Sequence, residues 1–217
     1  MGGPTAEETT VPAQTKEVSS AVASNIFWHS SKVSAQSRHE QLGHCPATVW
    51  LTGLSGAGKS TVAYELEKVL LTEGRPCYVL DGDNIRHHLN RDLGFSPADR
   101  KENIRRTAEV ARLMNEAGLI VVTSFISPFR EDRAMASEII GEDKFIEVYV
   151  STTAAVCESR DPKGLYAKAR SGQIPDFTGV NSPYEPPLCP ALSLDTGAMS
   201  LEEAAGVLYS HLAKRFG

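Results

Sequence analysis

The chain has 217 residues, of which 41% are hydrophobic and 23% are charged, so its composition is that of a globular protein rather than a disordered or fibrous one. Its 27 acidic and 22 basic side chains give a net charge of −5, which disfavours a protein that coats nucleic acid. No apolar run approaches the roughly 20 residues that a membrane-spanning helix needs, so we expect neither a nucleic-acid partner nor a membrane partner.

The N-terminal part differs in composition from the rest of the chain. Residues 1–24 are rich in Thr, Ser, Ala, Gly and Pro without a hydrophobic period, which predicts a disordered tail. Residues 25–46 form an N-terminal docking segment, in which Ile26, Phe27 and Trp28 could contact the core or a partner subunit. The chain starts without a secretory signal and its four cysteines form no CxxC pair, so we expect a cytoplasmic protein with reduced thiols.

From residue 47 to residue 217, short apolar runs alternate with helical patterns. Strands are predicted at 48–52, 77–80, 119–126, 145–150 and 191–194. Helices are predicted at 60–73, 97–117, 153–160 and 201–215, with a further helix opening at Ser127-Pro128. This alternation predicts one α/β domain, a three-layer fold in which a parallel five-stranded sheet has helices on both faces.

The first predicted strand runs into a phosphate-binding loop. The sequence GLSGAGKS at 53–60 matches GxxxxGK[ST] at each fixed position, between a strand and a helix. Glycines let backbone N–H groups surround phosphate oxygens, Lys59 can reach the β- and γ-phosphates, and Ser60 can ligate Mg²⁺. We therefore expect ATP and Mg²⁺ to bind here. The nucleotide-binding candidates are Gly53, Leu54, Ser55, Gly56, Ala57, Gly58, Lys59, Ser60 and Thr61.

Two carboxylates follow the second predicted strand. Asp81 and Asp83 are separated by one glycine, so both can face a metal ion or a substrate hydroxyl. One of them could hold Mg²⁺ through water, and the other could orient or deprotonate an attacking hydroxyl. An isolated Asp-Gly-Asp-Asn is more often a turn and a helix cap, and it is the neighbouring phosphate loop that favours the functional interpretation.

Two further regions indicate an anionic, aromatic acceptor. Residues 83–112 hold seven basic and five acidic side chains, a local excess of positive charge in an acidic chain. Some of those charges fit a solvated helix face with ion pairs, such as Arg105 with Glu109. Residues 161–183 are basic and punctuated by glycine, which predicts a lid segment that closes over phosphates.

Taken together, these motifs resemble the adenylylsulfate kinase family over residues 25–217. The strings that carry the resemblance are GLSGAGKST at 53–61, DGDNIRH at 81–87, LNRDLGFSPADRKENIRR at 89–106, SFISP at 124–128, DPKGLYAKAR at 161–170, and FTGV with PYEPP at 177–187. The resemblance implies a P-loop NTPase-type fold and transfer of the γ-phosphate of ATP to the 3′-hydroxyl of adenosine 5′-phosphosulfate (APS). The product would be 3′-phosphoadenosine 5′-phosphosulfate (PAPS), the activated form of sulfate.

The resemblance also implies roles for individual residues. APS would be contacted by Asp83, Arg86, Phe95, Arg100, Asn103, Ile126, Ser127, Lys163 and Phe177, with its adenine between the two phenylalanine rings. By the same resemblance, Asp83 would orient or deprotonate the 3′-hydroxyl, and Asp81 would join Ser60 at the Mg²⁺ site. Ser127 matches the position that the family gives as a phosphoserine intermediate, and it is a catalytic candidate with Lys59 and Asp83. In-line transfer needs no enzyme nucleophile, so we expect Ser127 to act by contact. The family also implies a homodimer and a possible separate ATP sulfurylase partner.

Two alternatives remain open from the sequence. One is a non-catalytic domain that senses PAPS, although Lys59, Ser60 and Asp83 are all intact. The other is a small-molecule kinase that acts on a sugar or a nucleoside monophosphate. The basic and aromatic residues at 86–106 and the sequence FTGV at 177–180 disfavour this sugar or nucleotide kinase.

Overall fold

The computed structural model describes residues 26–27 and 29–216, and it divides the chain into two units, residues 1–32 and residues 33–217. In the first unit, the side chains of Ile26 and Phe27 are exposed. The predicted tail at 1–24 and Trp28 lie outside the described residues, so the expectations about them stay predictions. All the elements described below belong to the second unit.

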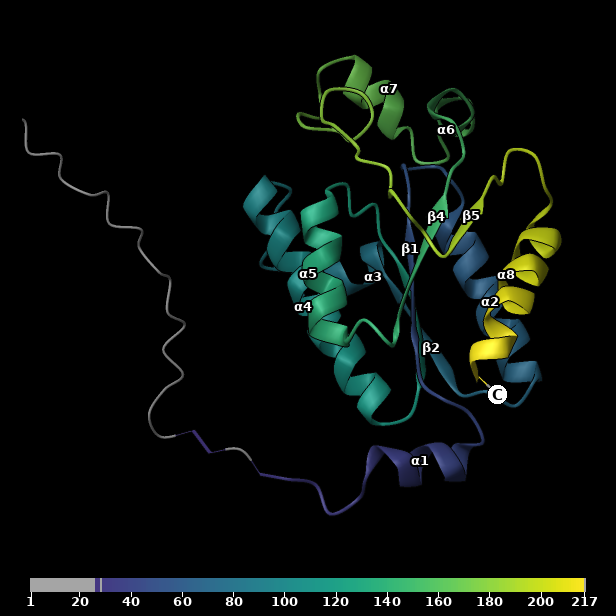
Figure 1. Cartoon of the computed structure of the whole chain (residues 1–217). Helices are drawn as coiled ribbons and strands as arrows, with labels where there is room; N and C mark the ends of the chain where they lie inside the picture. The colour runs from purple at the N-terminus through teal and green to yellow at the C-terminus, as the bar shows by residue number, and fades with distance from the viewer. Residues whose placement is uncertain (1–25, 28, 217) are drawn as a thin grey trace, which may run out of the picture. The chain divides into compact units, whose positions relative to one another are not determined.

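A parallel sheet of five strands forms the centre of this unit (Figure 1). The strands are β1 (Thr48–Thr52), β2 (Cys77–Asp81), β3 (Ile120–Ser124), β4 (Phe145–Val150) and β5 (Leu192–Leu194), in the spatial order β2-β3-β1-β4-β5. Thr48 lies opposite Val121 on one side and Phe145 on the other, so β1 is the central strand. This arrangement confirms the predicted fold and brings the carboxyl ends of all five strands to one edge.

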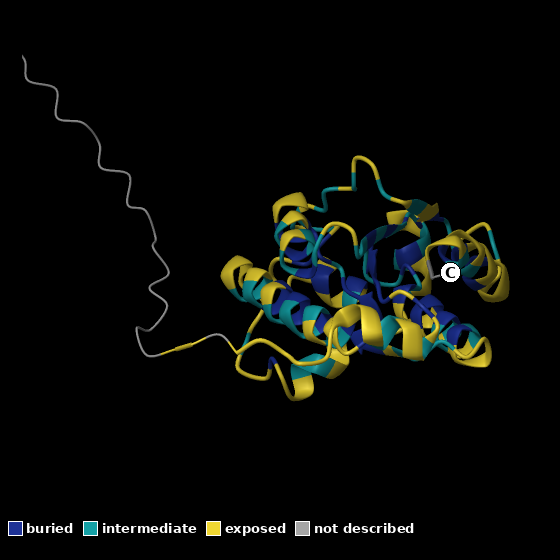
Figure 2. Ribbon diagram, turned by 60° about the horizontal axis from the view of Figure 1, so that its bottom comes forward, coloured by how far each residue is buried: buried dark blue, intermediate teal, exposed yellow. Residues whose placement is uncertain are grey.

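Helices cover both faces of the sheet (Figure 1). One face carries α2 (Lys59–Thr72) and α8 (Leu201–Phe216), and the other carries α4 (Pro97–Glu116) and α5 (Arg130–Ile140). Successive side chains of β1 serve the two cores in turn, because Val49 and Leu51 pack with α2 and α8 while Trp50 packs with α4 and α5. The buried residues accordingly run through the middle of the layers, and the outer faces of the helices are exposed (Figure 2). None of the helices among the described residues is long and apolar enough to cross a membrane.

Two predicted helix starts are confirmed in atomic detail. Ser96 Oγ accepts from Asp99 N at 3.2 Å, and Pro97 is the first residue of α4. Ser200 and Glu203 form a reciprocal capping box before α8, with backbone-to-side-chain distances of 2.7 and 3.1 Å. The predicted helix at 153–160 is also present, as α6 (Ala154–Arg160) with Thr153 as its cap.

The helix predicted to open at Ser127-Pro128 begins later, at Arg130. The strand before it also ends at Ser124 rather than at residue 126, so residues 125–129 form a turn. Ser127 has a positive φ of 37°, which a helical start does not allow, and Pro128 O accepts from Glu185 N at 2.8 Å. A contact from a distant part of the chain therefore overrides the local Ser-Pro signal.

Three short helices were not predicted, namely α1 (Ala35–Leu42), α3 (Gly82–His87) and α7 (Leu165–Arg170). Each has six to eight residues, too few for a clear hydrophobic period. α1 rests on the turn that follows α4, where a Cβ at Gly118 would lie 2.4 Å from Leu42 Cδ1. α7 lies inside the predicted lid segment.

Candidate active site

The phosphate loop (residues 53–60) leads from the end of β1 into α2, and its backbone leaves no room for side chains at two of its glycines. A Cβ at Gly53 would lie 2.5 Å from Val150 O, and one at Gly56 would lie 2.9 Å from Cys157 O. Gly53, Gly56 and Gly58 all have positive φ, and Gly58 is the N-cap of α2. The loop therefore has the conformation that the sequence predicts for a phosphate cradle.

Two threonines that the sequence analysis missed brace this loop from neighbouring strand ends. Thr196 Oγ1, just after β5, donates to Ala57 O at 2.8 Å. Thr152 follows β4, and its hydroxyl lies 2.9 Å from that of Thr196. Arg160 also donates to Thr196 O at 2.6 Å. A signal for these residues existed, since polar residues that follow different parallel strands converge at one edge of the sheet.

Lys59 is buried at the start of α2. Its Nζ donates to Leu54 O at 2.8 Å, so the side chain folds back over the phosphate loop. Burial lowers the pKa of Lys59 to about 8, against the opposing effect of the Asp81 and Asp83 carboxylates. An anionic phosphate at this position would supply the partner that favours the charged ammonium.

Asp81 lies in a cluster of oxygen-bearing side chains that could bind a divalent cation. Its Oδ1 accepts from Asp83 N at 3.0 Å and so caps α3, while its Oδ2 accepts from Ser60 Oγ at 2.6 Å. The Ser60 hydroxyl also lies 3.0 Å from the Ser124 hydroxyl. The structure therefore brings together the two predicted metal-site residues, Ser60 and Asp81, and it adds Ser124 to them.

Asp83 lies in the first turn of α3 with an exposed side chain. Its carboxylate forms an ion pair with Lys163 of the predicted lid segment. These two predicted residues are 80 positions apart in the chain, and their contact joins the edge of β2 to the lid.

Arg86 and Phe95 form a flat basic surface beside α3. The Arg86 guanidinium lies 4.5 Å from the centroid of the Phe95 ring, and its NH1 donates to Gly94 O at 2.9 Å. Phe95 is 66% exposed, so its ring is not part of the hydrophobic core. Burial and the nearby charge of Arg100 lower the pKa of Arg86.

Arg100, in the first turns of α4, joins that helix to the lid segment. Its guanidinium donates to Asp176 O at 2.5 Å, Thr178 Oγ1 at 2.8 Å and Phe95 O at 2.8 Å. Two of these three acceptors are lid residues. The structure thus brings Arg100 together with Phe95, as predicted, and places both beside the segment that contains Phe177.

The remaining predicted acceptor residues are more buried. Asn103 Oδ1 accepts from the buried Asn90 Nδ2 at 3.0 Å. The Phe177 ring is 8% exposed and packs edge-on against Tyr166, at 5.0 Å between centroids. Its packing against Tyr166 was not foreseen, and its predicted contact with an adenine stays a prediction.

Ile126 and Ser127 belong to the turn after β3. The Ser127 side chain is 3% exposed, and its Oγ accepts from Trp50 Nε1 at 3.2 Å. Ile126 is half-buried, and its carbonyl accepts from Thr52 Oγ1 at 2.8 Å. The hydroxyl of Ser127 therefore points into the protein, toward the core face of β1.

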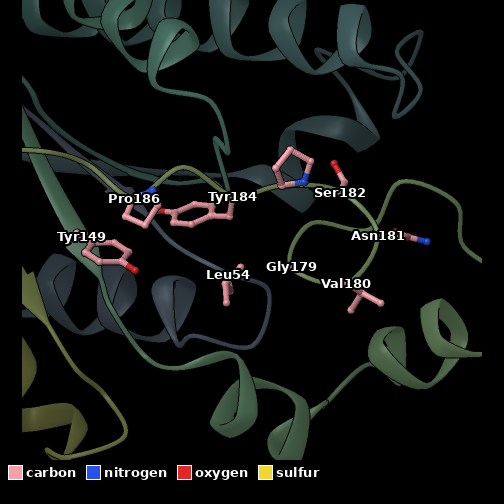
Figure 3. A pocket seen from close by; sticks show the side chains of 9 residues that line it. Leu54, Tyr149, Gly179, Val180, Asn181, Ser182, Tyr184 and Pro186 are labelled. Atoms are coloured by element: carbon pink, nitrogen blue, oxygen red, sulfur yellow. The ribbon is translucent and has the colours of Figure 1, made fainter.

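A pocket of about 620 Å³ opens beside the phosphate loop (Figure 3). Leu54 is the one predicted site residue that lines it, and the other lining side chains come from the end of β4 and from the lid and the residues after it. Tyr149 and Tyr184 stack there at 6.0 Å between ring centroids. The sequence analysis did not single out either tyrosine.

Comparisons with known proteins show which sequences and structures this chain is similar to. The family model described as adenylylsulphate kinase matches residues 45–195. An adenylyl-sulfate kinase of Bacillus licheniformis is 53% identical over 191 residues, which is 88% of this chain and 97% of that protein. The structure of the Mycobacterium tuberculosis APS kinase in complex with AMPPNP and APS matches with a TM-score of 0.75 and 50% identity, over 77% of this chain and 98% of that one. A hexameric APS kinase from Thiobacillus denitrificans is 32% identical with a TM-score of 0.60, over 79% of this chain and 29% of that one.

Proposed function

Because the chain belongs to the adenylylsulfate kinase family, we infer that it transfers the γ-phosphoryl group of ATP to the 3′-hydroxyl of APS, giving PAPS and ADP. One observation carries this function in the structure. The phosphate loop and the acceptor residues Asp83, Arg86 and Arg100 lie at the same edge of the sheet, and Lys163 and Arg100 join them to one lid segment.

On the donor side, we assign the phosphates of ATP to the phosphate loop and the first turn of α2. The positive φ angles at Gly56 and Gly58 let successive backbone N–H groups face one anion, and the N-terminal end of the 14-residue helix adds a positive dipole. Lys59 would leave Leu54 O to contact the phosphates. Its charge then offsets the negative charge that gathers on the bridging oxygen as the bond to the γ-phosphorus breaks.

Ser60 and Asp81 are the residues that we expect to hold Mg²⁺, and their chemistry fits that ion. A hydroxyl and a carboxylate 2.6 Å apart are hard oxygen ligands, and Mg²⁺ commonly takes one or two carboxylates with substrate phosphates and water. When bound, Mg²⁺ neutralises charge on the phosphates of ATP.

On the acceptor side, we propose that Arg86, Arg100 and Asn103 bind the phosphosulfate end of APS, together with the turn at Ile126. Both guanidinium groups are partly buried, and they repel each other electrostatically, so an anion between them would be strongly favoured. The exposed ring of Phe95 and the ring of Phe177 would contact the adenine. These assignments rest on the resemblance and on the proximity of the residues.

Asp83 is the residue that we expect to accept the proton of the 3′-hydroxyl. In the reaction the 3′-oxygen bonds to the γ-phosphorus, the bond to the bridging oxygen of ADP breaks, and the proton passes to the Asp83 carboxylate. Lys163 of the lid segment forms an ion pair with that carboxylate. Lys163 can then pair with the phosphates instead, within the same lid segment.

We propose that Ser127 takes part by contact and not as a nucleophile. Its Oγ is buried and accepts from Trp50 Nε1, so it faces away from the edge of the sheet where the substrates would meet. A covalent relay would require this hydroxyl to turn outward. Ser127→Ala should therefore keep most of the activity, and loss of turnover comparable to that of Lys59→Ala would contradict the proposal.

The experiment that tests the function measures PAPS and ADP by chromatography after incubation of the purified protein with MgATP and APS. AMP and GMP serve as control acceptors, and Lys59→Ala serves as the control variant. We expect PAPS from APS alone and none from Lys59→Ala. If ATP and APS bind without turnover, the protein is a sensing domain; if AMP or GMP is phosphorylated instead, it is a different kinase.

Three further properties are proposals that follow from the family. We expect a homodimer in the cytoplasm, with APS supplied by a separate ATP sulfurylase. Sedimentation of the full chain at micromolar concentration tests the dimer, and a monomer would refute it. Pull-down with a purified sulfurylase tests the second partner.

A further inference from the structure

We propose that Arg133 is a positioning residue for the APS site, which acts by holding the turn at residues 126–128 (the substrate turn) in its strained conformation. This inference rests on the proposed function, because that function assigns Ile126 and Ser127 to the APS pocket. No motif of the sequence analysis includes Arg133. Its side chain lies on α5, behind the substrate turn.

The strain in the substrate turn is the first part of the argument. Ser127 has a φ of 37°, in the left-handed region that side chains with a Cβ rarely adopt. Such a conformation is unfavourable for a residue with a Cβ and persists only where surrounding contacts enforce it. Contacts to the Ser127 backbone are therefore the ones that keep the turn in place.

Those contacts come chiefly from Arg133. Its NH1 donates to Ser127 O at 2.7 Å, and its NH2 donates to Glu185 O at 2.8 Å. Its Nε donates to the Glu147 carboxylate on β4 at 2.6 Å. The side chain is 3% exposed. The hydrogen bonds donated by this one buried guanidinium therefore hold the turn, the segment after the lid and the sheet relative to one another.

Thr52 provides a second hold, from the strand that leads into the phosphate loop. Its Oγ1 donates to Ile126 O at 2.8 Å, and it lies 3.0 Å from the Tyr184 hydroxyl. Because the peptide bond is planar and trans, an Ile126 carbonyl that faces Thr52 turns the N–H of Ser127 to the opposite side. The turn thus points the Ser127 N–H away from β1. The direction of this donor depends on the hydrogen bonds that hold the Ile126 and Ser127 carbonyls.

This arrangement has a specific consequence for catalysis. Arg133 touches neither substrate in the proposed mode of binding, and it lies apart from the phosphate loop. Its loss should therefore weaken APS binding and misplace the 3′-hydroxyl while ATP binding stays the same. A residue that only stabilises the fold would affect both substrates alike, or neither, at temperatures well below unfolding.

The test compares Arg133→Met with Arg133→Lys, and Arg112→Met is the matched control. Lysine can keep the pairing with Glu147 but cannot reach three acceptors with one planar group. We expect Arg133→Met to raise KM for APS about tenfold or more and to lower kcat, with KM for ATP within about twofold of wild type. Arg133→Lys should have a melting temperature close to that of wild type, but its KM for APS should stay almost as high as that of Arg133→Met. Arg112 pairs with Glu109 and Glu116 on the surface of α4, and its variant should match wild type.

A spectroscopic readout follows the turn without turnover. Trp50 donates to Ser127 Oγ, and the chain has only one other tryptophan, so a Trp28→Phe background isolates its emission. We expect Arg133→Met to change the emission of Trp50 in the folded protein and to weaken the response to added APS. If Arg133→Met does not fold, Thr52→Val tests the same hold on the turn from β1.

The outcomes separate the two proposals. If the wild-type protein makes no PAPS, the proposed function fails, whatever the variants do. If it makes PAPS and both Arg133→Met and Thr52→Val keep the wild-type KM for APS, kcat and Trp50 emission, the positioning role is wrong and the function stands.

Discussion

The donor and acceptor halves of the site are built in different ways. The phosphate loop is one continuous stretch, and its shape comes from glycine backbone angles and the start of one helix. The acceptor half joins α3, α4, the substrate turn and the lid, and its shape depends on side-chain contacts such as Arg100 to Thr178 and Lys163 to Asp83. Local backbone geometry thus sets one half, and contacts between distant residues set the other.

This difference predicts how each half responds to change. Steric damage to the phosphate loop should destabilise the protein, because its glycines lie against backbone atoms of β4 and α6. Damage to the proposed acceptor half should affect APS handling with less effect on stability, because its contact between Lys163 and Asp83 is an exposed ion pair. Substitutions at Gly53, Asp83 and Phe177 and the pH dependence of ATP binding test this difference.

Gly53→Ala should have the largest effect. The alanine Cβ would lie 2.5 Å from Val150 O at a φ of 152°. We therefore expect the free energy of unfolding to fall by about 3 kcal/mol and ATP binding to be lost. Urea unfolding measures the loss. Gly206→Ala is the control, because that helical glycine has nothing within 4 Å of its Cβ, and alanine should be neutral or stabilising there. Equal stability of the two variants would contradict the steric account.

Asp83→Asn should lower kcat about a hundredfold, because the amide cannot accept the proton of the 3′-hydroxyl. The Kd for ATP should change little, since Asp83 is exposed and lies outside the phosphate loop. Steady-state kinetics and ATP titration give the two quantities. Asp92→Asn is the control, because Asp92 pairs with Arg106 at the surface. An unchanged kcat in Asp83→Asn would reject Asp83 as the base.

Phe177→Ala should weaken APS binding by about 2 kcal/mol and leave ATP binding largely intact, because stacking of a base on an aromatic ring is worth about that much. Phe177 also packs against Tyr166, so the alanine variant should lose stability as well. Phe177→Leu keeps most of the volume without a ring and separates the two effects. Calorimetric titration with each ligand measures them, and an equal loss for ATP and APS would refute the assignment.

The smallest effect concerns pH. Burial gives Lys59 a pKa of about 8, so in the free protein the ammonium loses its proton as pH rises through that value. Phosphate binding favours the protonated form, and the Kd for ATP should therefore rise about tenfold between pH 7 and pH 9, with proton uptake on binding at the higher pH. Titrations in buffers of different ionisation enthalpy detect that uptake. Lys59→Arg stays charged throughout, so its Kd should be flat; a flat wild-type profile would contradict the lowered pKa.

The same contrast explains what the sequence predicts. The order and type of the main strands and helices follow from hydrophobic periodicity and caps, and Ser96 and Ser200 cap where expected. The phosphate loop is equally predictable from the sequence, because the residues that shape it are neighbours in the chain. The turn at Ser127 is not, because Glu185 and Arg133 hold it from later in the chain.

Some site residues have no local signal at all. Thr196 belongs to the support of the phosphate loop, although 139 positions separate it from Ala57. In the sequence, Arg133 is one of several charged residues of a helix. Only the fold shows that it is buried and contacts Ser127. Residues of this kind become visible when the strand order is known, because it decides which strand ends are neighbours.

The support of the phosphate loop by Thr196 has a consequence for synthesis of the protein. The loop is translated well before Thr196 and before α8, which covers α2. A nascent chain that has not reached those residues therefore carries the complete motif but lacks the contacts that fix it and the helix that buries its apolar side. Binding of nucleotide should thus begin only after α8 has been made, and premature termination near residue 195 should give a product that aggregates rather than a partly active kinase.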